Sequence, residues 1–239
     1  MTTPFSLLRL PRLALIPVFQ QMEPIDLIAF SLLSNQTMRL SKFFRLKTQD
    51  IWLRLEANNI EIVVFLTCGR QLRLQYFFEN SRVVWRIERK EIVWHKVGGL
   101  SMIECIYRII KVTHCDFISV LIVAEIPQYD VFPLLALLPT ISEVLVSNDT
   151  PATLVLRVLR VVLSKTSKLN LFPTNQLTKM GKFQELLIVN LDIITISGEI
   201  NVPFTLDDLL ITNAVKIRLN EPTLNEKDLN RFFQAVDEK

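Results

Sequence analysis

The side chains best suited to chemistry are few in this chain, and only two groups of them lie close together in the sequence. Cys105, His114 and Cys115 could supply three ligands to a metal ion, because thiolates and imidazoles are the groups that zinc prefers. Their spacing matches no known zinc pattern, and their apolar surroundings favour buried structural thiols. Asp207 and Asp208 could suggest a carboxylate pair, but adjacent helical positions diverge by about 100°. Acids in the first turn of a helix, where they stabilise its N-terminus, explain this pair better.

The sequence contains no motif of a common enzyme class. The glycine patterns that bind nucleotides, the metalloprotease helix motif, the nucleophile elbow and the paired C-x-x-C are all absent. Five glycines in 239 residues leave little material for a phosphate-binding loop. We therefore expect no catalytic residues, no cofactor and no metal, in a protein that is not an enzyme.

The composition indicates a globular chain with no nucleic-acid or membrane partner. Half of the residues are hydrophobic, and the 27 basic and 24 acidic residues form no polybasic tract. Three cysteines at irregular spacing indicate free thiols in a reducing compartment, which is the cytoplasm or the nucleus. The longest apolar runs, 117–124 and 131–139, are shorter than the roughly 20 residues that cross a bilayer.

The first 22 residues leave one alternative open. They contain Arg9 and Arg12 and no acidic residue, as a mitochondrial presequence does. Pro11 and Pro17 would break the amphipathic helix that a presequence needs, and no small-x-small cleavage site follows. This alternative describes an organellar enzyme with a cleaved N-terminus.

A small helical module is predicted at the start of the chain, where residues 10–44 read LPRLALIPVFQQMEPIDLIAFSLLSNQTMRLSKFF. Leu27, Ile28 and Leu32 follow the spacing of one helix face, and Pro24 marks the first turn of that helix. The segment resembles the F-box motif, which opens with Leu-Pro, turns at a proline followed by an acid and a leucine, and continues into a Leu-Ser-rich helix. Pro17 departs from the pattern because it falls inside the first expected helix.

The resemblance implies a partner. In F-box proteins this module, here residues 1–47, binds a Skp-type adaptor, which in turn binds the cullin scaffold of an SCF ubiquitin ligase. A module of this size does not bury all of its apolar surface, which favours such an interaction. The residues predicted to bind the adaptor are Leu10, Pro11, Met22, Pro24, Leu27, Ile28 and Leu32.

Residues 48–100 are predicted to form a β-rich connector. Apolar residues alternate with polar ones from Ile51 and again from Leu72, which is the period of a half-buried strand. We interpret the interleaved aromatic and basic residues as an antiparallel sheet with a solvated basic face, in preference to a platform for nucleic acid. Strands are expected at 51–55, 62–67, 72–78, 83–87 and 92–94, with a turn at 68–70.

Residues 101–239 are predicted to alternate strands with helices, which makes the fold α+β or α/β. The spacing of strand starts is that of leucine-rich-repeat-like strand-helix repeats, by analogy only. Residues 143–148 and 185–190 share a pattern of an acid, three apolar residues, any residue and asparagine. Thr205 and Asp208 have the spacing of a capping box, and Thr150 that of an N-cap. Helices are expected at 103–110, 151–164 and 225–236, and strands at 119–124, 143–147, 168–172, 185–189 and 215–219.

A second resemblance lies in residues 204–234, which read FTLDDLLITNAVKIRLNEPTLNEKDLNRFFQ. They are similar to the type 2 F-box-associated domain of the large nematode F-box families. Leu206–Leu210 matches the Leu-Asp/Glu-Asp-Leu-Leu that precedes a strand there, and Asp228–Phe232 matches the Asp-Leu-Asn-Arg-Phe that ends a helix. Chains of that family usually continue past this helix, so we expect the last repeat here to lack its cap.

Taken together, these features predict a non-enzymatic adaptor. Residues 1–47 would bind the Skp-type adaptor and, through it, the cullin, while the C-terminal domain would recruit a protein substrate by proximity. The sequence identifies neither that substrate nor the residues that bind it. Two alternatives remain, a protein-binding repeat scaffold unrelated to ubiquitin and the organellar enzyme described above.

Overall fold

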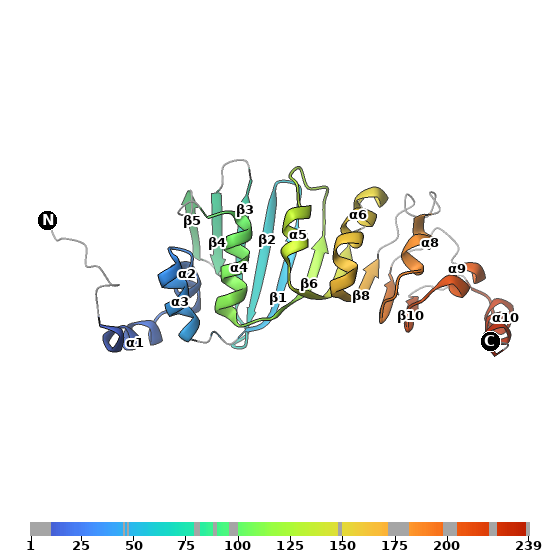
Figure 1. The fold of residues 1–239 in the computed structure, drawn as a ribbon, viewed down its shortest axis with the longest axis horizontal. Helices are drawn as coiled ribbons and strands as arrows, with labels where there is room; N and C mark the ends of the chain where they lie inside the picture. Colours follow the sequence, from blue (N-terminus) through green and yellow to red (C-terminus); the bar gives the residue numbers. More distant parts are fainter. Residues whose placement is uncertain are drawn as a thin grey trace. The chain divides into compact units, whose positions relative to one another are not determined.

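The structure, a computed structural model, divides the chain into two compact units. Unit 1 comprises Met1–Ile51 and Ile62–Asp116, and unit 2 comprises Trp52–Glu61 and Phe117–Lys239. Helices are followed by a strand-rich mixed sheet and further helices, so the fold is α+β (Figure 1). The residues that the structure describes are 11–44, 46, 48–78, 82–87, 90–95, 100–147, 150–171, 182–197, 205–219 and 224–237. No helix in these ranges is both long and apolar enough to cross a membrane.

Unit 1 begins with three short helices, α1 (Arg12–Gln20), α2 (Pro24–Ser31) and α3 (Asn35–Phe43). The prediction that Pro24 occupies the first turn of a helix is confirmed. Ser34 caps α3, since its hydroxyl accepts the Thr37 N–H while the Thr37 hydroxyl accepts the Ser34 N–H.

Pro17 lies inside α1, and the helix runs through it. A proline has no N–H to donate to the carbonyl of the residue four positions earlier, and its ring crowds that carbonyl. The Pro17 side chain is exposed, while Leu15 and Phe19 on either side of it are buried. The first predicted helix therefore forms in full, and buried neighbours hold it around the proline.

The second part of unit 1 is antiparallel sheet and one long helix, α4 (Met102–Thr113). β3 (Gln71–Phe77) pairs with β4 (Arg82–Ile87), which pairs with β5 (Lys90–His95). The predicted turn at 68–70 is confirmed, because Gly69 has a φ of 80° and donates its N–H to the Leu66 carbonyl. The aromatic and basic side chains of β4 and β5 lie outside the described residues.

Unit 2 is built from parallel strands. β1 (Thr48–Leu55) and β2 (Asn59–Leu66) contribute residues to both units, and the order in unit 2 is β10-β9-β8-β7-β6-β1. Parallel neighbours need crossover connections, which here contain helices. The other strands are β6 (Phe117–Val123), β7 (Thr140–Val146), β8 (Thr166–Leu171), β9 (Ile193–Ile196) and β10 (Lys216–Leu219). The helices are α5 (Phe132–Leu137), α6 (Ala152–Val162), η2 (Leu163–Lys165), α8 (Lys182–Leu187), α9 (Leu206–Ile211) and α10 (Glu226–Asp237).

The strand predicted at 185–189 is wrong. These residues belong to α8 and the turn that follows it, and the next strand is β9. A short apolar run is consistent with either a strand or a buried helix, and here Leu187 is buried while Glu185 is exposed at the surface. The pattern shared by residues 143–148 and 185–190 therefore marks a strand in one copy and a helix in the other.

Two predicted helix starts have different outcomes. Thr205 and Asp208 form the expected capping box at the start of α9. Thr150 is not an N-cap, because α6 begins after Pro151 without a side-chain cap, and the Thr150 hydroxyl donates instead to the Val123 carbonyl at 3.2 Å. Burial of Thr150 at the end of β6 explains this choice, since a buried hydroxyl requires a partner.

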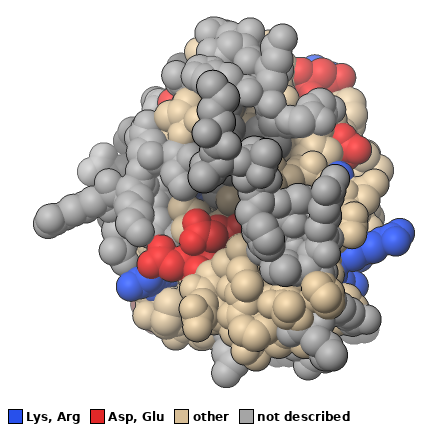
Figure 2. All heavy atoms as spheres, turned by 90° about the vertical axis from the view of Figure 1, so that its left-hand side faces the viewer, with Lys and Arg blue, Asp and Glu red and all other residues tan. Residues whose placement is uncertain are grey.

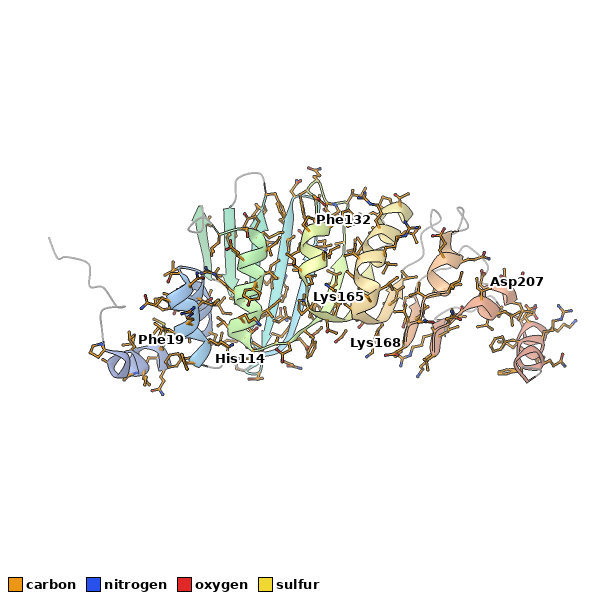
Figure 3. The ribbon with its side chains drawn as sticks, in the orientation of Figure 1. Phe19, His114, Phe132, Lys165, Lys168 and Asp207 are labelled. Atoms are coloured by element: carbon orange, nitrogen blue, oxygen red, sulfur yellow. The ribbon has the colours of Figure 1, made fainter. Side chains whose placement is uncertain are left out.

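Lys165 fixes the end of α5, and its loss should be measurable. Its ammonium donates to the carbonyls of Ala136 at 2.6 Å and Leu138 at 2.9 Å, where a helix C-terminus favours a cation. We expect Lys165→Met to lower the free energy of unfolding by about 1–2 kcal/mol, measured by urea denaturation. The exposed Lys168, labelled beside it in Figure 3, is the matched control, and Lys168→Met should change the same quantity by less than about 0.5 kcal/mol. Equal effects of the two substitutions would contradict this role.

Candidate docking surface

The three N-terminal helices share a small aromatic core centred on Phe19. Its ring stacks on Phe44 with centroids 4.8 Å apart and meets Phe30 edge to face at 5.1 Å. Leu15 and Leu27 are buried in the same cluster, against which Met22, Leu40 and Leu46 also pack. Figure 3 shows Phe19 among these helices. Aromatic pairs of this geometry add about 0.5–1.5 kcal/mol each beyond the area they bury, so the helices form one packed module.

A buried arginine joins this module to α4 within unit 1. Arg108 is 7% exposed and donates to the carbonyls of Ser31 at 3.2 Å and Leu32 at 3.3 Å, and to Oδ1 of Asn35 at 2.8 Å. These acceptors lie at the end of α2 and the start of α3, where helix termini leave backbone groups unpaired. At the other end of α4, Nε2 of His114 lies 2.8 Å from the Lys42 carbonyl. Both ends of α3 are thus held against α4.

A groove of about 300 Å³ opens between α1 and α3. Two side chains beside it are strongly exposed for their type, Ile16 at 38% and Phe43 at 65%. Exposed apolar side chains gathered around a groove are typical of a protein-binding surface. We call this the α1/α3 groove, and its lining residues are Leu15, Ile16, Phe19, Gln20, Leu40, Phe43 and Phe44.

Charged groups lie around this surface and not within it. Arg39 and Lys42 are exposed on α3, whereas none of the groove's lining residues is charged. Figure 2 turns the left-hand side of Figure 1 towards the viewer, and its lower coloured area is mainly uncharged, with acidic and basic groups at its borders. An apolar centre with a polar rim is the usual composition of a docking surface.

The residues predicted to bind the Skp-type adaptor are divided between surface and core. Leu10 lies outside the described residues, and Pro11 is exposed just before α1. Met22 and Pro24 are half-buried, with Met22 packed on the aromatic core. The last three are core residues, with exposed fractions of 4%, 0% and 0% for Leu27, Ile28 and Leu32.

This burial gives Leu27, Ile28 and Leu32 a structural role within the module. A side chain without exposed area does not touch a partner unless the module rearranges, so Leu27, Ile28 and Leu32 hold the helices together in this conformation. Their helical spacing was predicted correctly, but it marks the face that α2 turns to its own core. The exposed apolar side chains lie on α1 and α3 instead.

Sequence reasoning missed Ile16 and Phe43, although one signal for Phe43 was present. Phe43 and Phe44 are consecutive, and adjacent positions at a helix end point about 100° apart, so one ring of such a pair is left outside a small core. Phe44 stacks on Phe19, which leaves Phe43 exposed. Ile16 carried no such signal, because it lies within an unbroken apolar run.

The candidate metal and acid residues do not form a site. Cys105 is fully buried, and desolvation raises the pKa of its thiol to about 11, while Cys115 lies 3.1 Å from the Thr48 hydroxyl. Across the described ranges, no group of three or more potential ligands could hold a metal ion. Asp208 accepts the Thr205 N–H in the capping box, and Asp207 is exposed on α9 (Figure 3).

Comparison with known proteins identifies two segments of the chain. Residues 7–49 match the model of the F-box domain, and residues 182–235 match that of the family described as F-box associated. The chain therefore carries an N-terminal F-box, which includes α1–α3, and a C-terminal F-box-associated domain, which includes α8, β9, α9, β10 and α10. Searches of curated proteins and of solved structures returned no significant match.

Proposed function

We propose that this protein is the substrate-recruiting subunit of an SCF-type ubiquitin ligase and that it is not itself an enzyme. The combination of an F-box with an F-box-associated domain supports this function. In this role the chain contributes proximity, because it holds a substrate near the partner enzymes that transfer ubiquitin. The cytoplasm or the nucleus is the compartment that fits this function.

The F-box would contact the Skp-type adaptor, and through it the cullin, by way of the α1/α3 groove. Phe43 and Ile16 are the anchors in this proposal, because each presents a large apolar side chain beside the groove. Pro11 and Leu10, which precede α1, extend the same surface in the proposal. Met22 and Pro24 support it from α2 and the turn before it.

Unit 2 would recruit the substrate. Its parallel strands are joined by helical connections, which supports a leucine-rich-repeat-like arrangement of strand-helix repeats. Such repeats present an extended surface, and the F-box-associated domain occupies the last part of it.

Binding of a purified Skp-type adaptor tests the proposal directly. The intact chain should bind the adaptor, and Phe43→Asp or Ile16→Asp should weaken binding at least tenfold, because each places a carboxylate in an apolar contact. Isothermal titration calorimetry gives the affinities. Leu137→Asp is the matched control, since Leu137 is 67% exposed on α5 in unit 2, and it should leave the affinity unchanged.

Two results separate the possible failures. If the folded wild-type chain does not bind the adaptor, the ligase function is wrong, and a repeat scaffold unrelated to ubiquitin becomes the better description. If the wild type binds but neither groove substitution weakens binding, the docking surface is wrong and the function stands. Circular dichroism on each variant establishes that it is folded.

A further inference from the structure

The strands of unit 2 turn one side of their sheet to the helices and expose the other. In Figure 1 the helices α5, α6 and α8 lie on one face of these strands. The residues on that face are in register and almost completely buried, namely Leu121, Val144, Leu169 and Ile194. Side chains alternate along a strand, so the residues immediately before and after each of these four point to the opposite face.

We call that opposite side the open face, and strand register defines it. Its residues form two rows across five strands, two positions apart along each strand. All of them are half-buried or exposed. The first row is Val120, Glu143, Lys168, Ile193 and Lys216, and the second row is Ile122, Leu145, Asn170, Thr195 and Arg218.

Positive charge collects at the β8–β10 end of the open face. Lys168, Lys216 and Arg218 are all exposed, and the carboxylate of the two rows is Glu143, next to Lys168. Strands lie about 4.8 Å apart and residues two apart on one strand about 6.7 Å, so the three cations lie within roughly 12 Å at the backbone. Like charges this close repel one another, and an anionic partner would relieve that repulsion.

Apolar side chains occupy the rest of the open face. Val120, Ile122 and Leu145 cover β6 and β7, and Ile193 lies between Lys168 and Lys216 on β9. The rows continue onto β1 at Trp52 and Arg54, where Arg54 already pairs with Glu56 at 2.9 Å. The surface thus combines exposed basic groups with apolar contact area, which suits a protein segment of mixed character.

We infer that the open face binds an extended acidic segment of a partner protein. Carboxylates of the segment would contact Lys168, Lys216 and Arg218, and its apolar side chains would contact Val120, Leu145 and Ile193. Naming this segment as part of a ubiquitination substrate rests on the proposed function; the binding itself does not.

The open face favours this partner over two others. A second copy of the chain would present the same three cations and be repelled. Nucleic acid would require many neutralised phosphates, whereas the rows hold three basic residues and one carboxylate. An acidic peptide matches both the modest positive charge of the open face and the apolar side chains in its two rows.

Fluorescence anisotropy with a synthetic probe tests the inference on the full-length chain. The probe is a fluorescein-labelled peptide in which every second residue is glutamate and the residues between are leucine or serine. The control peptide carries glutamine at each glutamate position. We expect the glutamate peptide to bind about tenfold more tightly, and its binding to weaken as salt rises, because exposed charge pairs are screened.

Charge reversal on the open face should abolish this preference. Lys168→Glu combined with Arg218→Glu should weaken binding of the glutamate peptide at least tenfold and leave the glutamine peptide unchanged. The matched control is Arg160→Glu combined with Lys227→Glu, which changes the same net charge at exposed residues of α6 and α10 and should leave the preference intact. If the reversed variant fails to fold, Lys168→Gln with Arg218→Gln replaces it and should give a smaller loss in the same direction.

Several outcomes would overturn the inference. They are equal binding of the two peptides to the wild type, an undiminished preference after charge reversal, and tighter binding of a single-stranded oligonucleotide than of the glutamate peptide. If charge reversal of Lys216 on β10 weakened peptide binding while charge reversal of Lys168 on β8 did not, the peptide would be pairing with strand β10 and not binding the open face. The reversed variant should still bind the Skp-type adaptor, so loss of peptide binding and loss of adaptor docking can be told apart.

Discussion

Replacing Arg108 with methionine is expected to lower the free energy of unfolding by about 3 kcal/mol, because one side chain serves three buried or half-buried acceptors. Methionine keeps the length of the aliphatic stem but donates no hydrogen bond. The carbonyls of Ser31 and Leu32 and Oδ1 of Asn35 would lose a charged donor at once. The F-box should therefore loosen from α4 before the rest of the chain unfolds.

Urea denaturation and amide hydrogen exchange measure this effect. Exchange at the end of α2 and the start of α3 should accelerate, because those backbone groups lie where Arg108 binds. Lys111→Met is the matched control on the same helix, since Lys111 is exposed and its ammonium lies 5.2 Å from the Tyr107 ring centroid. This substitution should lower the free energy of unfolding by less than about 0.5 kcal/mol. A stability change no larger than that of the control would show that Arg108 does not hold the F-box.

Arg108 also shows where sequence reasoning stops. The helix predicted at 103–110 rests on an apolar face at i, i+3, i+4 and i+7, which is Ile103, Ile106, Tyr107 and Ile110, and α4 confirms that the helix exists. Its buried face is rotated from the predicted one, however, because Tyr107 is 54% exposed while Arg108 is buried. The three acceptors of Arg108 lie 73 to 77 residues earlier in the chain, and no local pattern encodes a partner at that distance.

The same limit applies to strands and helices in unit 2. Short apolar runs located β6, β7, β8 and β10, and in the first three of these strands the pattern marks residues that are buried. It failed at α8, where four apolar residues fit a strand and a helix equally well. The open face was beyond prediction for a different reason: it depends on which residues are in register across five strands, and register is a tertiary property.

For the F-box, the sequence predicted the module and its second helix, and three of the residues it proposed for the contact surface are buried in the module's own core. An apolar stripe on a helix shows that one face is buried, but it does not show whether the partner is the same chain or another one. In α2 the stripe of Leu27, Ile28 and Leu32 is satisfied internally. The surface that remains for another chain is defined by what the core leaves exposed, which only the packing of α1 against α3 decides.

Substituting Phe19 and Phe43, which both line the α1/α3 groove, distinguishes the core of the module from its proposed contact surface. Phe19→Ala should lower the free energy of unfolding by about 3–5 kcal/mol, because the ring is 1% exposed and contacts both Phe30 and Phe44. Phe43→Ala removes the same atoms from a ring that is 65% exposed, so stability should change by less than about 1 kcal/mol.

Affinity for the Skp-type adaptor should depend on these two residues in the opposite way, with the larger effect at Phe43. Phe43→Ala should weaken binding by about tenfold or more in a fully folded protein, because its ring is an anchor of the proposed contact. Phe19→Ala should weaken binding only in proportion to the fraction of chain that is unfolded, and the remaining folded fraction should bind normally. Calorimetry for binding, set against urea denaturation for folding, gives both quantities on the same samples. If Phe43→Ala destabilised the chain as much as Phe19→Ala and left the affinity of the folded protein unchanged, Phe43 would be a core residue and the groove would not be the docking surface.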